Sequence, residues 1–242
     1  MQEKISISIN SALIKKVDSK VDHKYVRNRS QAFEMIVKEY FEASGVNVSI
    51  VLLGKAKKVN IELLKRHLMT MSRVGVREVL IAAGPNNTTI FSIFGSEFEE
   101  MKLAYVREER LLGTAGIIKS VQDKINTTFL VISGDVNFDF DLRGMIDFHM
   151  QKHSIATMCV TSVDLKESTD HIKIEGDKVL SFEYNGKTKS VIINAAIYVF
   201  EPEILSLLPK VGSLEKDVFP KISKEGRLLA YMSSASNWSQ VE

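Results

Sequence analysis

The chain opens with a short stretch in which apolar and polar residues alternate strictly. Residues 4–10 read KISISIN, with isoleucine at every second position and polar residues between. A period of two predicts a strand with one apolar face and one polar face. Because one strand cannot bury its apolar face alone, we expect it to pair with the same strand of a second copy, under a cover of helices.

Two amphipathic helices are predicted after this strand. Residues 11–21 place four apolar side chains on one stripe, which is typical of a helix packed on one face. The second helix is predicted to begin at Ser30, a favourable N-cap residue, and to end before residues 43–45. The strand and the two helices together predict a small first domain over residues 1–45.

This strand-helix-helix order resembles the ribbon-helix-helix repressors of the Arc, MetJ and CopG type. In that family the paired strands lie in the DNA major groove, where their outward side chains read base edges. The resemblance implies base contacts from Lys4, Ser6 and Ser8, and phosphate contacts where the second helix begins. The phosphate contacts would come from Arg27, Arg29 and Ser30. The alternative is a module that serves only dimerisation.

Charge and composition add modest support to this picture. Residues 1–45 hold eight Lys and Arg against six Asp and Glu, so the whole formal net charge of +2 lies in the first domain. No apolar run approaches the roughly 18 residues of a membrane helix, and the first residues do not resemble a signal peptide. The single cysteine, Cys159, lies in a strand-like run and is predicted to be buried. We expect a cytoplasmic, nucleoid-associated protein without a membrane partner.

From residue 46 onward, predicted strands alternate with predicted helices. The strands cover residues 48–53, 78–83, 103–106 and 129–133, and the helices cover residues 61–74 and 114–125. This alternation predicts an α/β domain with a mostly parallel sheet and helices on both faces. Ligands of such sheets bind at the carboxyl ends of the strands, where Asp135 follows the fourth strand.

Several segments of this second domain resemble the sugar-1-phosphate nucleotidylyltransferases. They are residues 111–116 (LLGTAG), 129–136 (FLVISGDV), 148–149 (FH), 193–202 (INAAIYVFEP), 214–220 (LEKDVFP) and Trp238. The resemblance implies a Rossmann-like nucleotidyltransferase fold, with a mostly parallel mixed sheet, over residues 46–242. Members of the family join a sugar 1-phosphate to a nucleoside triphosphate and release pyrophosphate. The resemblance also implies a ligand pocket around Gly113, Thr114, Ala115, Gly116, Asp135 and Asn194.

The sequence departs from that family at positions that carry its chemistry. The segment 53–60 (LGKAKKVN) lacks the Gly-rich loop that holds the triphosphate, although it keeps three lysines. Asn185 stands where the family has the Lys that holds the sugar phosphate. Gln240 stands in place of a second metal-binding Asp, which leaves Asp135 alone. Two small residues of the family are also replaced, by His171 and Ala196.

These departures lead to a pseudoenzyme interpretation of the second domain, in which no cofactor is required and Mg²⁺ or a nucleotide is at most a sensed ligand. Three functions follow from the sequence. The first is a sequence-specific transcription regulator that binds double-stranded DNA as a dimer of dimers or a larger oligomer. The second is an active sugar-1-phosphate nucleotidylyltransferase that uses the first domain only to dimerise. The third is an assembly protein without catalytic activity. The missing loop favours the first function over the second.

Overall fold

The computed structural model describes most of the chain. It covers residues 6–22, 24, 26–42, 45–54, 59–84, 88–106, 108, 110–233 and 238–241, with the side chains at 38–42, 88, 163–169 and 185–191 outside the description. The chain divides into two compact units, Met1–Ala43 (unit 1) and Ser44–Glu242 (unit 2). Within the described part, every helix is too short or too polar to span a membrane.

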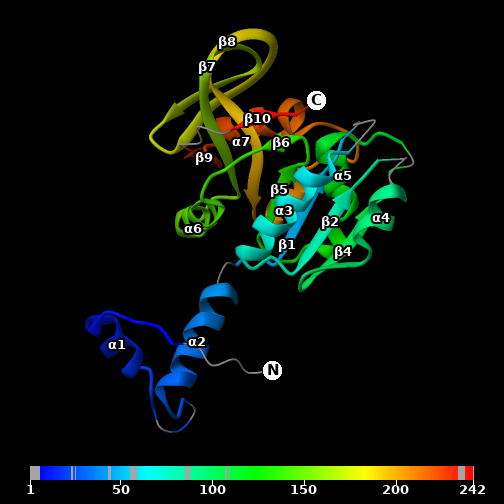
Figure 1. Ribbon diagram of the computed structural model, residues 1–242. Helices are drawn as coiled ribbons and strands as arrows, with labels where there is room; N and C mark the ends of the chain where they lie inside the picture. The colour runs from blue at the N-terminus through cyan, green and yellow to red at the C-terminus, as the bar shows by residue number, and fades with distance from the viewer. Residues whose placement is uncertain are drawn as a thin grey trace. The chain divides into compact units, whose positions relative to one another are not determined.

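Unit 1 contains two helices, α1 (Ser11–Asp18) and α2 (Arg29–Glu42) (Figure 1). The prediction that Ser30 caps the second helix is wrong. The side-chain oxygen of Asn28 accepts a hydrogen bond from the amide of Gln31 at 3.0 Å, which is the N-cap arrangement. Ser30 therefore lies within the first turn of α2.

The strand predicted at the start of unit 1 is not formed in its described part, residues 6–10. Residues 4 and 5 of that prediction lie outside the described residues. The predicted partner was the same strand of a second copy, and a strand's hydrogen bonds need such a neighbour. A single chain does not supply that neighbour, so the ribbon of the ribbon-helix-helix prediction is not observed.

Unit 2 is built on an eight-stranded sheet in the order β3-β4-β2-β1-β5-β8-β7-β9. The strands are β1 (Val48–Leu52), β2 (Glu78–Ala82), β3 (Glu97–Phe98), β4 (Met101–Val106), β5 (Phe129–Ser133), β7 (Ala156–Glu175), β8 (Lys178–Phe200) and β9 (Leu228–Ser233). The four adjacent strands β4, β2, β1 and β5 run parallel, whereas β8 pairs antiparallel with both β5 and β7. The predicted α/β domain with a largely parallel, mixed sheet is confirmed.

Helices cover both faces of this sheet. They are α3 (Ile61–Arg73), α4 (Thr88–Phe94), α5 (Gly113–Ser120), α6 (Leu142–Lys152) and α7 (Phe219–Lys224), with the short 3₁₀ segments η1 (Gln122–Lys124) and η2 (Pro202–Ser206) and the π-helical turn η3 (Leu214–Val218). The single helix predicted over residues 114–125 is therefore two shorter segments, since α5 ends at Ser120.

The core lies in two layers, one on each face of the sheet. Successive residues of β1 alternate between them: Ile50 packs in one layer and Val51 in the other. Leu68 of α3 shares the layer of Val51, whereas Ile118 of α5 and Phe219 of α7 share the layer of Ile50. Both faces of the sheet are buried, which explains why its central strands read as continuous apolar runs.

Two pairings complete the fold. Strands β7 and β8 form a long hairpin that continues beyond the main body of the sheet (Figure 1). At the end of the described chain, β10 (Ser239–Gln240) pairs antiparallel with β6 (Val136–Asn137). Because β6 follows β5 directly, this second pairing brings the end of the chain to the carboxyl end of β5.

Candidate active site

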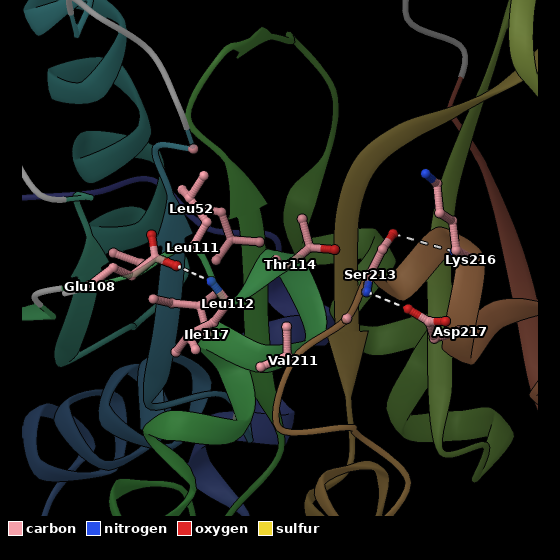
Figure 2. Close-up of a pocket in the computed structure, with 14 residues that line it drawn as sticks. Leu52, Glu108, Leu111, Leu112, Thr114, Ile117, Val211, Ser213, Lys216 and Asp217 are labelled. Carbon is pink, nitrogen blue, oxygen red and sulfur yellow. Dashed lines mark hydrogen bonds between the residues drawn. The ribbon is translucent and has the colours of Figure 1, made fainter.

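A cavity of about 460 Å³ lies at the carboxyl ends of β1 and β2, beside the start of α5 (Figure 2). Its apolar walls come from Leu52, Ala82, Leu111, Leu112, Ile117 and Val211. Its polar groups come from Glu108, Thr114, Ser213, Lys216 and Asp217. This volume and this mostly apolar lining are typical of a pocket for a small molecule. The position also matches the edge where α/β sheets bind ligands.

The start of α5 is pressed against residues 210–212. Gly113 has φ +77°, and a Cβ on it would lie 2.3 Å from the carbonyl oxygen of Gly212. A Cβ on Gly116 would lie 2.7 Å from the carbonyl oxygen of Lys210. Both positions therefore require glycine, because a side chain would displace this backbone. Gly113 also lines the cavity, so this close contact fixes part of its wall.

The amides of Ala115 and Gly116, in the first turn of α5, are used within the protein. The Ala115 amide donates to the carbonyl oxygen of Gly212 at 3.1 Å, and the Gly212 amide donates to that of Leu112 at 2.8 Å. Of the four α5 residues predicted to line a ligand pocket, Gly113 and Thr114 border the cavity. Ala115 and Gly116 are buried. The segment therefore shapes the cavity mainly through its backbone packing.

A hydrogen-bonded cluster joins α5 to η3. The Thr114 hydroxyl donates to Glu215 at 3.1 Å and accepts from the Leu214 amide at 2.9 Å. The Ser213 hydroxyl also donates to Glu215, and the Ser213 amide donates to Asp217 at 2.7 Å. These bonds hold a π-helical turn at the edge of the cavity. Such turns are rare and often occur at functional sites.

Asp135 lies at the carboxyl end of β5, next to the strand that borders the cavity. Ser133 of β5 pairs with the cavity residue Leu52 of β1. The Ser133 hydroxyl donates to one carboxylate oxygen of Asp135, and the Gln240 side-chain amide donates to the other at 2.9 Å. The β6–β10 pairing thus joins two positions that are 105 residues apart in the sequence. Asp135 itself does not border the cavity.

Asn194, the last residue predicted to line the pocket, lies where the register between β7 and β8 shifts. Its side-chain amide donates to the Tyr198 hydroxyl at 2.9 Å, and its side-chain oxygen accepts from the Ala196 amide at 2.9 Å. Ala196 has φ +57°, a left-handed conformation that costs roughly 1–2 kcal/mol for a residue with a Cβ. Burial, with a further contribution from Glu215, holds the pKa of Tyr198 well above its ordinary value.

Two other titratable groups are used structurally. His149 is fully buried, contacts Thr157 at 2.7 Å and Glu201 at 3.2 Å, and has its pKa lowered by burial. Glu201 also accepts from Thr128, which precedes β5, so this cluster lies at the opposite end of that strand from Asp135. Cys159 is buried in β7, where loss of solvation raises its pKa to about 12. Its thiol is therefore not a nucleophile at neutral pH.

Two of the residues that differ from the family pattern, Asn185 and His171, have no side-chain interaction described in the structure. Asn185 lies in β8, but its side chain is outside the described residues. His171 lies in the β7–β8 hairpin, where it pairs with Glu183 across the strands. Among the described residues, no group of three or more His, Cys, Asp or Glu side chains is arranged to hold a metal ion.

Sequence reasoning missed four polar residues of the cavity, namely Glu108, Ser213, Lys216 and Asp217. Three of them lie within or next to the segment 214–220, which was recognised as a motif but given no role. The available signal was the charge of its three consecutive residues, 215–217. Their meeting with α5 depends on folding contacts made over about 100 residues, which no local pattern reveals.

Solved structures with the same fold support the architecture. HddC from Yersinia pseudotuberculosis superposes with a TM-score of 0.66 at 22% identity, over 80% of this chain and 92% of that one. A putative glucose-1-phosphate thymidylyltransferase from Bacillus anthracis gives a TM-score of 0.71 at 19% identity, over 81% of this chain and 89% of that one. At these identities the similarity establishes the fold alone.

Curated relatives are more informative about activity. A probable mannose-1-phosphate guanylyltransferase 3 of Arabidopsis thaliana is 29% identical over 182 residues, which are 71% of this chain and 55% of the relative. A mannose-1-phosphate guanylyltransferase of Mycobacterium tuberculosis is 29% identical over 188 residues, which are 72% of this chain and 51% of the relative. The chain spans about half the length of these curated relatives.

The interpretation of this protein as a DNA-binding transcription regulator is contradicted by these relatives, which are named as enzymes acting on a sugar phosphate. The DNA contacts predicted from that interpretation are therefore no longer expected. The Arg29 guanidinium makes two hydrogen bonds of 2.7 Å to Asp18 and lowers the pKa of that carboxyl, so it is already paired within unit 1. Ser6 and Ser8 are exposed without forming a strand. Lys4 lies outside the described residues.

The other two residues predicted to contact DNA are Arg27 and Ser30, both at the start of α2. The Arg27 amide donates to the Gln31 side chain at 2.7 Å, a bond that belongs to the start of α2. Ser30 is exposed in the first turn of that helix. Double-stranded DNA is therefore withdrawn as a partner.

The interpretation of unit 2 as an inactive domain is also contradicted by the guanylyltransferase relatives. That interpretation compared single positions with linear motifs. The cavity, however, is built from segments that run from Leu52 to Asp217, and it includes a cation, Lys216, to which that interpretation gave no role. Phosphate charge is neutralised by groups that meet in space, so a missing residue in one loop does not settle the chemistry.

A family model described as "Nucleotidyl transferase" matches residues 52–241. The match begins in β1, passes through the cavity and Asp135, and ends beyond Gln240. It therefore covers nearly all of unit 2 and more than half of the whole chain. With the sheet order and the positions of α5, β5 and η3 described above, this match establishes that the chain belongs to the nucleotidyl transferase family.

Proposed function

We propose that unit 2 is a sugar-1-phosphate nucleotidylyltransferase. In this reaction a phosphate oxygen of the sugar 1-phosphate attacks the α-phosphorus of a nucleoside triphosphate. The bond to the β-phosphate breaks, and pyrophosphate leaves as the nucleotide sugar forms. The observation that carries the proposal is the cavity at the carboxyl ends of β1 and β2, with Asp135 on the adjacent strand, in a chain of this family.

The cavity lining supports a nucleotide with guanine as its base. Apolar walls such as Leu52, Leu111 and Ile117 suit the flat faces of a purine. Glu108 is 8% exposed, lines the cavity, and uses one carboxylate oxygen to accept from the Leu112 amide at 3.1 Å. A carboxylate accepts well from two neighbouring N–H donors, which guanine offers on one edge and adenine does not. The names of the relatives agree with this choice.

Asp135 is the residue that fits a magnesium ion. Mg²⁺ in proteins is usually held by one or two carboxylates, water and the phosphates of the substrate, so a full set of protein ligands is not required. Asp135 would hold the ion, with the amide of Gln240 beside it. When bound, the ion neutralises charge that develops on the phosphates during transfer. Three lysines follow the cavity residue Gly54 in the sequence, namely Lys55, Lys57 and Lys58. They are candidates to neutralise the remaining negative charge of the triphosphate.

The test of this proposal is an assay of pyrophosphate release by the full chain. We expect release that requires Mg²⁺, a nucleoside triphosphate and a sugar 1-phosphate together, with GTP and mannose 1-phosphate as the first pair. GTP should be used in preference to ATP, because of the carboxylate of Glu108. If no combination of four nucleoside triphosphates with mannose, glucose or galactose 1-phosphate releases pyrophosphate, the proposal is wrong.

We further propose that unit 1 is a self-association module, with the ribbon-helix-helix arrangement completed by a second copy. Val17 and Ala32 are its buried hydrophobic residues within the described part, which is a very small core. Ile7, Leu13 and Val37 are about half exposed or more. Contact with a second copy would remove this apolar surface from water.

Self-association is tested by light scattering on the full chain. We expect a mass of at least two chains at micromolar concentration, and a shift toward one chain in the double variant Leu13→Asp, Val37→Asp. Leu207→Asp, at an exposed leucine of unit 2, is the matched control and should leave the mass unchanged. A wild-type protein that is monomeric under these conditions would contradict the proposed role of unit 1.

A further inference from the structure

The cavity contains one cation among its described lining residues, and this is Lys216. Most of the wall is apolar, and the remaining charged side chains are the carboxylates of Glu108 and Asp217. A site that brings two phosphorylated substrates together must offset their mutual repulsion. Within the described wall of this cavity, Lys216 is the side chain able to do so.

Lys216 lies in the middle of the π-helical turn η3, and its neighbours fix its position. Glu215 accepts hydrogen bonds from Thr114 and Ser213, and Asp217 accepts from the Ser213 amide. The Lys216 amide also donates to the Ser213 hydroxyl at 3.3 Å. The backbone that carries Lys216 is therefore held on both sides, although its side chain is exposed. Figure 2 shows this side chain beyond Ser213, across the cavity from Glu108 and Leu111.

The Lys216 ammonium group lies over an aromatic ring. Its Nζ is 4.8 Å from the centre of the Tyr184 ring, which comes from β8 in the long hairpin. None of the ion pairs between described side chains includes Lys216. A ring attracts a cation without neutralising its charge, whereas a carboxylate partner would compete with an incoming anion. This arrangement orients the ammonium group and keeps its charge available.

The two ends of the cavity differ in their charged side chains, and this difference indicates which part of each substrate binds at which end. Glu108 and the apolar residues at one end suit the base, as argued above. Lys216 lies at the other end, where its ammonium group is over Tyr184 of the β7–β8 hairpin. On the basis of the proposed function, we infer that Lys216 binds the phosphate of the sugar 1-phosphate and holds it for attack on the α-phosphorus of the nucleotide. A charge-assisted hydrogen bond from an ammonium group suits a phosphate monoester.

The inference is tested by titration calorimetry on the full chain with mannose 1-phosphate and with glucose 1-phosphate. Lys216→Met removes the charge and keeps the length of the side chain. We expect it to weaken binding of the sugar phosphates by about tenfold or more, because a hydrogen bond to a charged group is lost. Lys216→Arg should restore binding to within about threefold, since a guanidinium group also binds phosphate. Inorganic phosphate should compete with the sugar phosphate in the wild type.

Lys224→Met, at an exposed lysine of α7, is the matched control and should bind as the wild type does. Equal melting temperatures of the variants establish that each one folds. The inference is overturned if Lys216→Met binds both sugar phosphates like the wild type, if the control loses affinity equally, or if the wild type binds neither at millimolar concentration. Failure of the proposed function looks different: pyrophosphate release is absent, while binding that depends on Lys216 remains.

Discussion

Asp135→Asn is expected to lower the rate of pyrophosphate release by at least about a hundredfold, which is the usual effect of removing one group that stabilises charge in a transition state. The substitution keeps the shape of the side chain and replaces a charged oxygen by an amide. Asp135 accepts hydrogen bonds from Ser133 and Gln240 at the carboxyl end of β5. The loss should fall mainly on kcat and on the Mg²⁺ requirement, measured by steady-state kinetics across a series of Mg²⁺ concentrations.

Asp139→Asn is the matched control for this variant. Asp139 follows four residues later, is exposed, and belongs to a different groove, which Arg66 and Arg73 also line. It should retain nearly the full rate.

Gln240→Asp adds a second carboxylate beside Asp135 and is expected to lower the Mg²⁺ concentration needed for half-maximal rate. Turnover by Asp135→Asn within a few-fold of the wild-type rate would remove Asp135 from the chemistry.

The fold of unit 2 could be predicted because its signals are local. The run 129–133 (FLVIS) is apolar throughout, since β5 is buried on both faces, and the following Gly134 and Asp135 mark the edge where ligands bind. Helix α3 shows a regular apolar stripe that ends within one residue of the prediction. The family motifs around these elements then fixed the architecture. By contrast, the long β7–β8 hairpin carries register shifts, which break the alternation that would reveal it.

The candidate site was predicted less completely, because its parts meet only in the fold. Gly113 and Thr114 were named from their motif, but Lys216 joins them through a π-helical turn that no sequence period predicts. The strand predicted in unit 1 is not observed for a related reason, since its hydrogen bonds require a second chain. The wrong function followed from treating the missing Gly-rich loop at 53–60, with Asn185 and Gln240, as a loss of activity. Charge from a distant segment, at Lys216, reaches the cavity in the fold.

Gly113→Ala should produce the largest loss of stability among single changes at the cavity. Its φ of +77° costs a residue with a Cβ roughly 1–2 kcal/mol. The added Cβ would also lie 2.3 Å from the Gly212 carbonyl oxygen, so the backbone of one segment must move, at a further cost of about 1–3 kcal/mol. We expect a total loss of about 3 kcal/mol in the free energy of unfolding, measured by urea titration.

The same change should also weaken nucleotide binding, because the displaced segment carries the cavity residues Val211 and Gly212. Gly226→Ala separates the cost of the positive φ from the cost of the close contact with Gly212. Gly226 has φ +68°, but a Cβ on it would meet no atom within 4 Å, so this control should lose only about 1 kcal/mol, from backbone strain. It also lies outside the cavity lining and should bind GTP normally. Equal losses of stability in the two variants would show that the contact between residues 113 and 212 does not hold the cavity wall.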